Sequence, residues 1–226
     1  MHETDDIGAI AIVSNSVGSI TTDVGNGGMG NKVVKKRLAL FASGRGSNGE
    51  ALYKAMCDDY INGTFVVIIT DHHDAGIVQR ADGWGIPIVV IERSDYDSKA
   101  DFEAAQLEAL APYGVDGIVL AGYMRILGCQ LIDSYEHRIL NIHPALLPSF
   151  PGLHGHRQAI DAGVKVTGCT VHFVDAGMDT GPIIMQNTVP VLPDDTEDTL
   201  SKRLLPVEHA TYVEALRLFC ADKLSV

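Results

Sequence analysis

Residues 37–49 decide the fold, and they read Arg37-Leu38-Ala39-Leu40-Phe41-Ala42-Ser43-Gly44-Arg45-Gly46-Ser47-Asn48-Gly49. A short apolar run passes directly into a glycine-rich turn, and residues 47–59 then have the pattern of a helix. A strand that continues through a glycine loop into a helix is the first unit of a doubly wound sheet. This stretch therefore predicts a Rossmann-like unit that begins near residue 37.

The alternation continues downstream of this unit. Further strands are predicted at 65–70, 87–91 and 117–121, with helices at 76–83 and 98–111. Strands that alternate with helices pair in parallel through right-handed crossovers. The first half of the chain is therefore expected to form a parallel sheet.

After residue 135 the pattern changes. A strand at 138–142 ends in a proline-rich loop, and strands at 167–174 and 183–191 flank a glycine-rich loop through which they are expected to pair. Helices are predicted at 155–162 and 196–219. The expected fold is α/β: a doubly wound, mostly parallel sheet with a Rossmann-like N-terminal half and antiparallel strands in the C-terminal half.

The first 31 residues differ from the rest of the chain. Four glycines lie between residues 25 and 30, and no Lys or Arg occurs before Lys32. Because the stretch lacks the apolar periodicity that buries a face, residues 1–31 are expected to be a flexible N-terminal extension. Residues 32–226 are then one domain.

Composition and charge exclude several classes of protein. The formal net charge of −12 argues against a nucleic-acid partner, because binding to nucleic acid needs a basic surface. The apolar runs are too short to span a bilayer, and the N-terminus lacks the features of a secretory signal, so no membrane partner is expected. Four cysteines without a close pair suit reduced thiols in the cytoplasm.

The glycine loop leaves two interpretations open. Gly44, Gly46 and Gly49 match the dinucleotide fingerprint, and Asp71 ends the next strand at the distance of a ribose-binding acid. A nicotinamide enzyme, or a nucleotide-binding module without catalysis, would carry this pattern. The other interpretation needs only that amides at the helix start, with Ser47 and Asn48 beside them, bind a phosphate.

A second group of polar residues follows the strand at 138–142. Alternation places Asn141 and His143 on the same side of that strand, at the end that lines the ligand crevice of an open sheet. An Asn amide can donate to a developing oxyanion, and a His can donate to it or move a proton. A carboxylate from the glycine-rich loop at 175–182 could orient His143.

The nine histidines raise the question of a metal. The tightest groups are Asp71-His72-His73-Asp74 and the pair His154 and His156. Neither forms the HExxH motif, and no cysteine lies close enough to complete a zinc set. No catalytic metal is expected.

Five segments together resemble one family. Residues 43–48, 120–127, 141–148, 151–154 and 179–182 read Ser-Gly-Arg-Gly-Ser-Asn, Leu-Ala-Gly-Tyr-Met-Arg-Ile-Leu, Asn-Ile-His-Pro-Ala-Leu-Leu-Pro, Pro-Gly-Leu-His and Asp-Thr-Gly-Pro. In this order they are similar to the glycinamide ribonucleotide formyltransferases, a folate-dependent family. The resemblance extends from residue 37 to about residue 220.

The resemblance implies a role for particular residues. The catalytic residues would be Asn141, His143 and Asp179. The ribonucleotide would contact Gly46, Ser47, Asn48 and Glu208. The folate would contact Lys99, Met124, Arg125, Ile126, Leu127, Val174 and Asp175.

The resemblance also implies a reaction. A formyl group would pass from 10-formyltetrahydrofolate, as co-substrate, to the amine of glycinamide ribonucleotide in the cytoplasm, without a metal or a nicotinamide. A homodimer is compatible with this class of enzyme. Two related enzymes fit less well: a deformylase would need a regulatory domain before residue 37, and an initiator-tRNA formyltransferase would need a nucleic-acid domain after the last helix.

Overall fold

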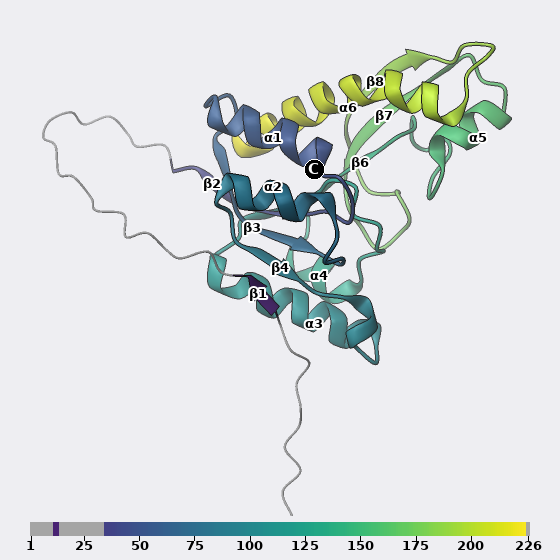
Figure 1. Ribbon diagram of the computed structural model, residues 1–226. Helices are drawn as coiled ribbons and strands as arrows, with labels where there is room; N and C mark the ends of the chain where they lie inside the picture. Colours follow the sequence, from purple (N-terminus) through teal and green to yellow (C-terminus); the bar gives the residue numbers. More distant parts are fainter. Residues whose placement is uncertain (1–10, 14–33, 225–226) are drawn as a thin grey trace, which may run out of the picture.

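The computed structural model describes residues 11–13 and 34–224, which form one mixed sheet flanked by helices (Figure 1). In chain order the strands are β1 (Ala11–Val13), β2 (Lys36–Phe41), β3 (Gly63–Thr70), β4 (Ile88–Val90), β5 (Gly117–Leu120), β6 (Ile139–His143), β7 (Val166–Phe173) and β8 (Ile183–Pro190). In space they follow the order β1-β4-β3-β2-β5-β6-β7-β8.

The expected fold class is confirmed. The strands β4, β3, β2, β5 and β6 pair in parallel, whereas β7 pairs antiparallel with both β6 and β8. The connecting helices are α1 (Ser47–Cys57), α2 (Gly76–Trp84) and α3 (Lys99–Leu110), followed by α5 (Gly155–Asp161) and α6 (Glu197–Cys220). The sequence did not predict α4 (Cys129–Ser134), a six-residue helix in which only Leu131 is buried, nor the short 3-10 helices η1 (Arg93–Asp95) and η2 (Ala111–Tyr113).

Helices cover both faces of the sheet. Figure 1 shows α1 and α6 on one side and α3 and α4 on the other. Leu38 and Leu40 of β2 pack into the core beneath α1, α2 and α6, while Ala39 and Phe41 pack into the core beneath α3 and α4. A strand buried on both faces is apolar throughout, which explains the continuous apolar run of β2.

The predicted extension lies mostly outside the described residues. Of residues 1–31 the structure describes only Ala11–Val13, which form the edge strand β1 and pair antiparallel with β4. In the described part of the chain, every helix is too short or too polar to span a bilayer.

The strand order reverses beside β2. The chain leaves β2 toward β3 and β4 on one side and then returns to β5 on the other side. In register, Phe41 lies next to Leu120, and Leu120 lies next to Asn141. The carboxyl ends of β2, β5 and β6 therefore meet at the point where open α/β sheets bind their ligands.

Candidate active site

The glycine loop after β2 leads directly into α1. Gly46 is the N-cap of α1 with a φ of 71°, and a Cβ added to it would lie 2.6 Å from Cδ1 of Ile77. Both the left-handed backbone and the close contact favour glycine here. Because no side chain caps α1, the amides of its first turn are available to an anionic ligand.

Two of the predicted ribonucleotide contacts, far apart in sequence, lie together. The Asn48 amide donates a hydrogen bond of 3.2 Å from Nδ2 to Oε2 of Glu208 on α6. Burial raises the pKa of Glu208, although the hydrogen bond from Asn48 partly opposes this shift. Oδ1 of Asn48 is buried and has no hydrogen-bond partner among the described residues. The Asn48 side chain thus has an unused acceptor for a ligand.

His143 and Asp179 are in contact. Nδ1 of His143 lies 3.3 Å from Oδ2 of Asp179, and Nε2 of His143 lies 2.8 Å from the carbonyl oxygen of Phe150. The imidazole is buried. A carbonyl and a carboxylate only accept hydrogen bonds, so both ring nitrogens face acceptors. This geometry suits an imidazolium cation at the carboxyl end of β6.

His172 on β7 completes the cluster, and the sequence analysis missed it. Asn141 and His172 are opposite each other in the β6–β7 register, and Nδ2 of Asn141 lies 3.2 Å from Nε2 of His172. The same Nε2 lies 3.6 Å from Oδ1 of Asp179. The buried His172 therefore links Asn141 to Asp179. Only the register between two strands, which a local pattern does not contain, could have identified it.

Asp179 is held in an unusual backbone conformation. Its φ is 56°, and its Oδ2 accepts a hydrogen bond of 2.8 Å from the backbone N–H of Gly152. Burial opposes ionisation of Asp179. Hydrogen bonds from His172 and Gly152, together with the charge on His143, outweigh burial and hold the pKa of Asp179 below its usual range. Asp179 is therefore a carboxylate at neutral pH.

The loop before Asp179 is stabilised from within. Oδ1 of Asp175 accepts hydrogen bonds from the N–H of Gly177 at 3.1 Å and from Oγ1 of Thr180 at 2.8 Å. The N–H of Val174 donates to the carbonyl of Ile139. In this structure Asp175 shapes the loop, and its predicted contact with folate stays a prediction.

The segment after β5 presents two apolar side chains to solvent. Met124 and Ile126 are 65% and 68% exposed, whereas Leu127 is buried in the core beneath α3 and α4. Oγ of Ser43 accepts a 2.9 Å hydrogen bond from the N–H of Met124. Nζ of Lys99 donates a 3.2 Å bond to the carbonyl of Leu127. The segment is thus tied to the glycine loop at one end and to α3 at the other.

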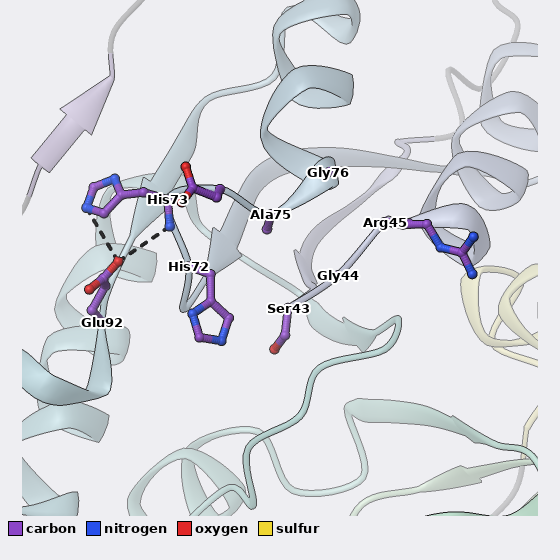
Figure 2. Close-up of a pocket in the computed structure, with 9 residues that line it drawn as sticks. Ser43, Gly44, Arg45, His72, His73, Ala75, Gly76 and Glu92 are labelled. Atoms are coloured by element: carbon purple, nitrogen blue, oxygen red, sulfur yellow. Dashed lines mark hydrogen bonds and ion pairs between the residues drawn. The ribbon is translucent and has the colours of Figure 1, made fainter.

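A cavity of about 420 Å³ lies between the glycine loop and residues 72–76, which follow β3. It is lined by Ser43, Gly44, Arg45, His72, His73, Asp74, Ala75, Gly76 and Glu92. Figure 2 shows His73 joined to Glu92 and Arg45 pointing away from the two histidines. The described residues contain no group of three or more His, Cys, Asp or Glu side chains placed to hold a metal ion.

Asp71 does not offer its carboxylate to this cavity. Its side chain is fully buried, and its Oδ2 accepts a hydrogen bond of 2.6 Å from Nε of Arg125. A dinucleotide fingerprint needs this acid to face a ribose. The geometry therefore favours the interpretation of the glycine loop as an anion site over its interpretation as a nicotinamide site.

Comparison with known proteins gives consistent results. Residues 36–216 match the family described as formyl transferase. The chain is 42% identical over 182 residues to the phosphoribosylglycinamide formyltransferase of Bacillus subtilis (strain 168), covering 80% of this chain and 93% of that protein. It also matches the crystal structure of glycinamide ribonucleotide transformylase 1 from Symbiobacterium toebii with a TM-score of 0.83 and 45% identity, covering 85% of this chain and 91% of that one.

The same fold also occurs in an enzyme with a different name. A formyltetrahydrofolate deformylase from Pseudomonas syringae pv. tomato matches with a TM-score of 0.79 at 31% identity, covering 85% of this chain and 63% of that one. The fold alone therefore does not separate transfer of a formyl group to an amine from its transfer to water.

Proposed function

The chain belongs to the formyl transferase family, and from that premise we propose how its residues perform the reaction. It transfers a formyl group from 10-formyltetrahydrofolate to the amine of glycinamide ribonucleotide. The products are formylglycinamide ribonucleotide and tetrahydrofolate, in purine biosynthesis. We assign the chemistry to Asn141, His143 and Asp179.

One observation supports this assignment above the others. The contact of 3.3 Å between His143 and Asp179 lies at the carboxyl end of β6, beside the point where the strand order reverses. A buried cation held by a carboxylate is suited to stabilise negative charge that develops on a reacting oxygen. The Asn141 amide on the same strand is a second donor for that oxygen.

The reaction proceeds through a tetrahedral intermediate. The substrate amine attacks the formyl carbon, and the formyl oxygen gains negative charge. His143 and Asn141 stabilise this oxygen, because donors aligned before the reaction need no reorganisation during it. Asp179 keeps His143 oriented and charged. Through a water molecule, Asp179 also helps to move a proton from the attacking amine to the departing folate nitrogen.

The ribonucleotide occupies the start of α1. Its phosphate is bound by the backbone amides of Gly46 and Ser47, where the positive end of the helix dipole attracts an anion locally although the chain carries a net charge of −12. Asn48 and Glu208, which are hydrogen-bonded to each other, contact the rest of the nucleotide. This arrangement places the substrate amine toward the ends of β5 and β6.

The folate lies along the segment after β5. The backbone of residues 125–127 contacts the pterin, with Met124 and Ile126 providing exposed apolar surface for a flat ring. The loop at 174–179 closes over the pterin from the opposite side, and Lys99 lies toward the folate tail. Holding both substrates in one crevice accounts for much of the acceleration.

A single assay tests the function. Purified protein is mixed with a stable 10-formylfolate analogue and glycinamide ribonucleotide, and the deformylated folate is followed by absorbance. We expect release of the deformylated analogue only when the ribonucleotide is present. Equal release without the ribonucleotide would instead assign the chain to the deformylases.

The proposal extends to the organisation of the protein. Residues 1–31 are an extension of a formyltransferase domain at 32–226. A homodimer in the cytoplasm is the form in which the enzyme acts, and sedimentation of the purified protein and cell fractionation test these two points.

A further inference from the structure

The mechanism does not explain the buried carboxylate of Asp71. Asp71 follows β3 directly, and its side chain is fully buried. Its Oδ1 has no hydrogen-bond partner among the described residues. Burial of a carboxylate costs free energy unless a charged group compensates for it. The side chain that pairs with Asp71 therefore indicates the role of Asp71.

Arg125 is that partner. Its Nε lies 2.6 Å from Oδ2 of Asp71, and its side chain is 40% exposed. The half-exposed His72 is a further neighbour, and its Nε2 lies 3.5 Å from the same oxygen. The contact with Arg125 is the shorter of the two, and its guanidinium is always charged, so Arg125 is the main electrostatic partner of Asp71. The pair joins the end of β3 to the segment after β5, across the glycine loop that follows β2.

The pair acts on a short segment that is anchored at both ends, with the side chain of Leu127 buried in the core. Met124 is bonded through its N–H to Ser43, and Leu127 through its carbonyl to Lys99. Arg125 lies between these two anchors, and its side chain is the tie to β3. If Arg125 lost its partner, the backbone between Met124 and Leu127 would lose that tie.

We propose that Asp71 is a positioning residue that sets folate affinity by holding residues 124–127 in place through Arg125. The proposal deepens the proposed function and rests on it, since it assumes that this segment contacts the folate. Asp71 itself touches neither substrate. Its effect should therefore appear in folate binding and leave ribonucleotide binding unchanged.

The substitution Asp71→Asn tests this, because it removes the charge and nearly conserves the shape. We expect the KM for the 10-formylfolate analogue to rise about tenfold, the scale of losing one charge-assisted hydrogen bond. The KM for glycinamide ribonucleotide and the kcat at saturation should stay within about twofold. Titration calorimetry with the folate analogue alone should show the same loss of affinity without turnover.

Two further variants serve as controls. Asp74→Asn makes the same chemical change three residues away, at an exposed position, and should leave both KM values unchanged. Arg125→Gln should weaken folate binding as Asp71→Asn does, and the double variant should be little worse than either single one, because both remove the same contact. Arg125→Gln also provides the test if Asp71→Asn does not fold.

Specific results would overturn the proposal. Unchanged folate affinity in a folded Asp71→Asn protein would do so, as would an equal rise of both KM values, which indicates a general loss of structure. A rise confined to the ribonucleotide would place Asp71 with the acceptor site instead. Absence of transfer by the unaltered protein would contradict the proposed function, and is thereby distinguishable from these results.

Discussion

Asn141 and His172 lie directly opposite each other on the antiparallel strands β6 and β7, with Nδ2 of Asn141 3.2 Å from Nε2 of His172. Nδ1 of His172 lies 2.8 Å from the carbonyl of Phe173, which can only accept, so Nδ1 carries a proton. Nε2 lies between the Asn141 amide and Oδ1 of Asp179, which is 3.6 Å away. The Asn141 amide, which we propose as an oxyanion donor, is thus in contact with a histidine on the neighbouring strand.

His143→Ala should reduce kcat by about 10² or more, because it removes stabilisation that exists only in the transition state. Both substrates should still bind with affinities close to those of the unaltered protein. Steady-state kinetics together with calorimetric binding of each substrate measure the two effects separately. Near-normal turnover would remove His143 from the mechanism.

Asp179→Asn should lower turnover at neutral pH by roughly one to three orders of magnitude. This is the loss in rate expected when general acid–base catalysis or oxyanion stabilisation is removed. The effect on stability should depend on pH. The pKa of Asp179 lies below its usual range in the folded protein. The carboxylate therefore stabilises the fold at pH values above the ordinary pKa that Asp179 has in the unfolded chain. This stabilisation is lost as the pH falls through the folded value.

The pH dependence can be read from melting temperatures. The Tm of Asp179→Asn should lie below that of the unaltered protein at pH 7, and the difference should shrink below about pH 4. The matched control is Asp175→Asn, in the same loop but without contact to His143. A Tm difference that does not change with pH would contradict the electrostatic role of Asp179.

Glu208→Gln should raise the KM for glycinamide ribonucleotide about tenfold, since a neutral amide is a weaker acceptor than a carboxylate. Burial raises the pKa of Glu208, so between the ordinary carboxyl pKa and the raised one the folded protein retains a proton that the unfolded chain releases. Stability is therefore lost as the pH rises from the ordinary carboxyl value through the raised one. The variant should show equal or higher Tm at pH 7, and a clear fall in Tm would contradict this account.

Ser47→Ala combined with Asn48→Ala should raise the apparent KM for glycinamide ribonucleotide and leave folate binding largely intact. Both side chains lie at the start of α1, where we propose that the ribonucleotide binds. Thermal shifts provide an independent measurement: the ribonucleotide should stabilise the unaltered protein and stabilise this variant less. Stabilisation by micromolar NAD but not by the ribonucleotide would favour a dehydrogenase.

Deletion of residues 1–28 should leave kcat, both KM values and Tm almost unchanged. It removes the edge strand β1, whose three residues pair with β4 and which is separated by four strands from β6 and the proposed trio in the order of the sheet. Kinetics and calorimetric melting of the shortened chain provide the test. A fall of several degrees in Tm would show that this segment packs on the domain.

The sequence by itself determined the elements and the class of fold. The unit at residues 37–49, the strand–helix alternation and the helix that begins after Thr196 all follow from apolar spacing and capping chemistry, which act within a few neighbouring residues. Local signals of this kind also placed Asn141 and His143 on one side of β6. The short helix α4, with one buried residue, offered too little periodicity to be predicted.

The tertiary structure alone decided which distant residues meet. It brought His172 opposite Asn141, the Phe150 carbonyl onto His143, and Glu208 onto Asn48. It also turned Asp71, which the glycine pattern suggested as a ribose ligand, inward onto Arg125. These contacts depend on strand register, strand order and crossover geometry, which arise from the packing of the whole sheet and leave no periodic trace in the neighbouring sequence.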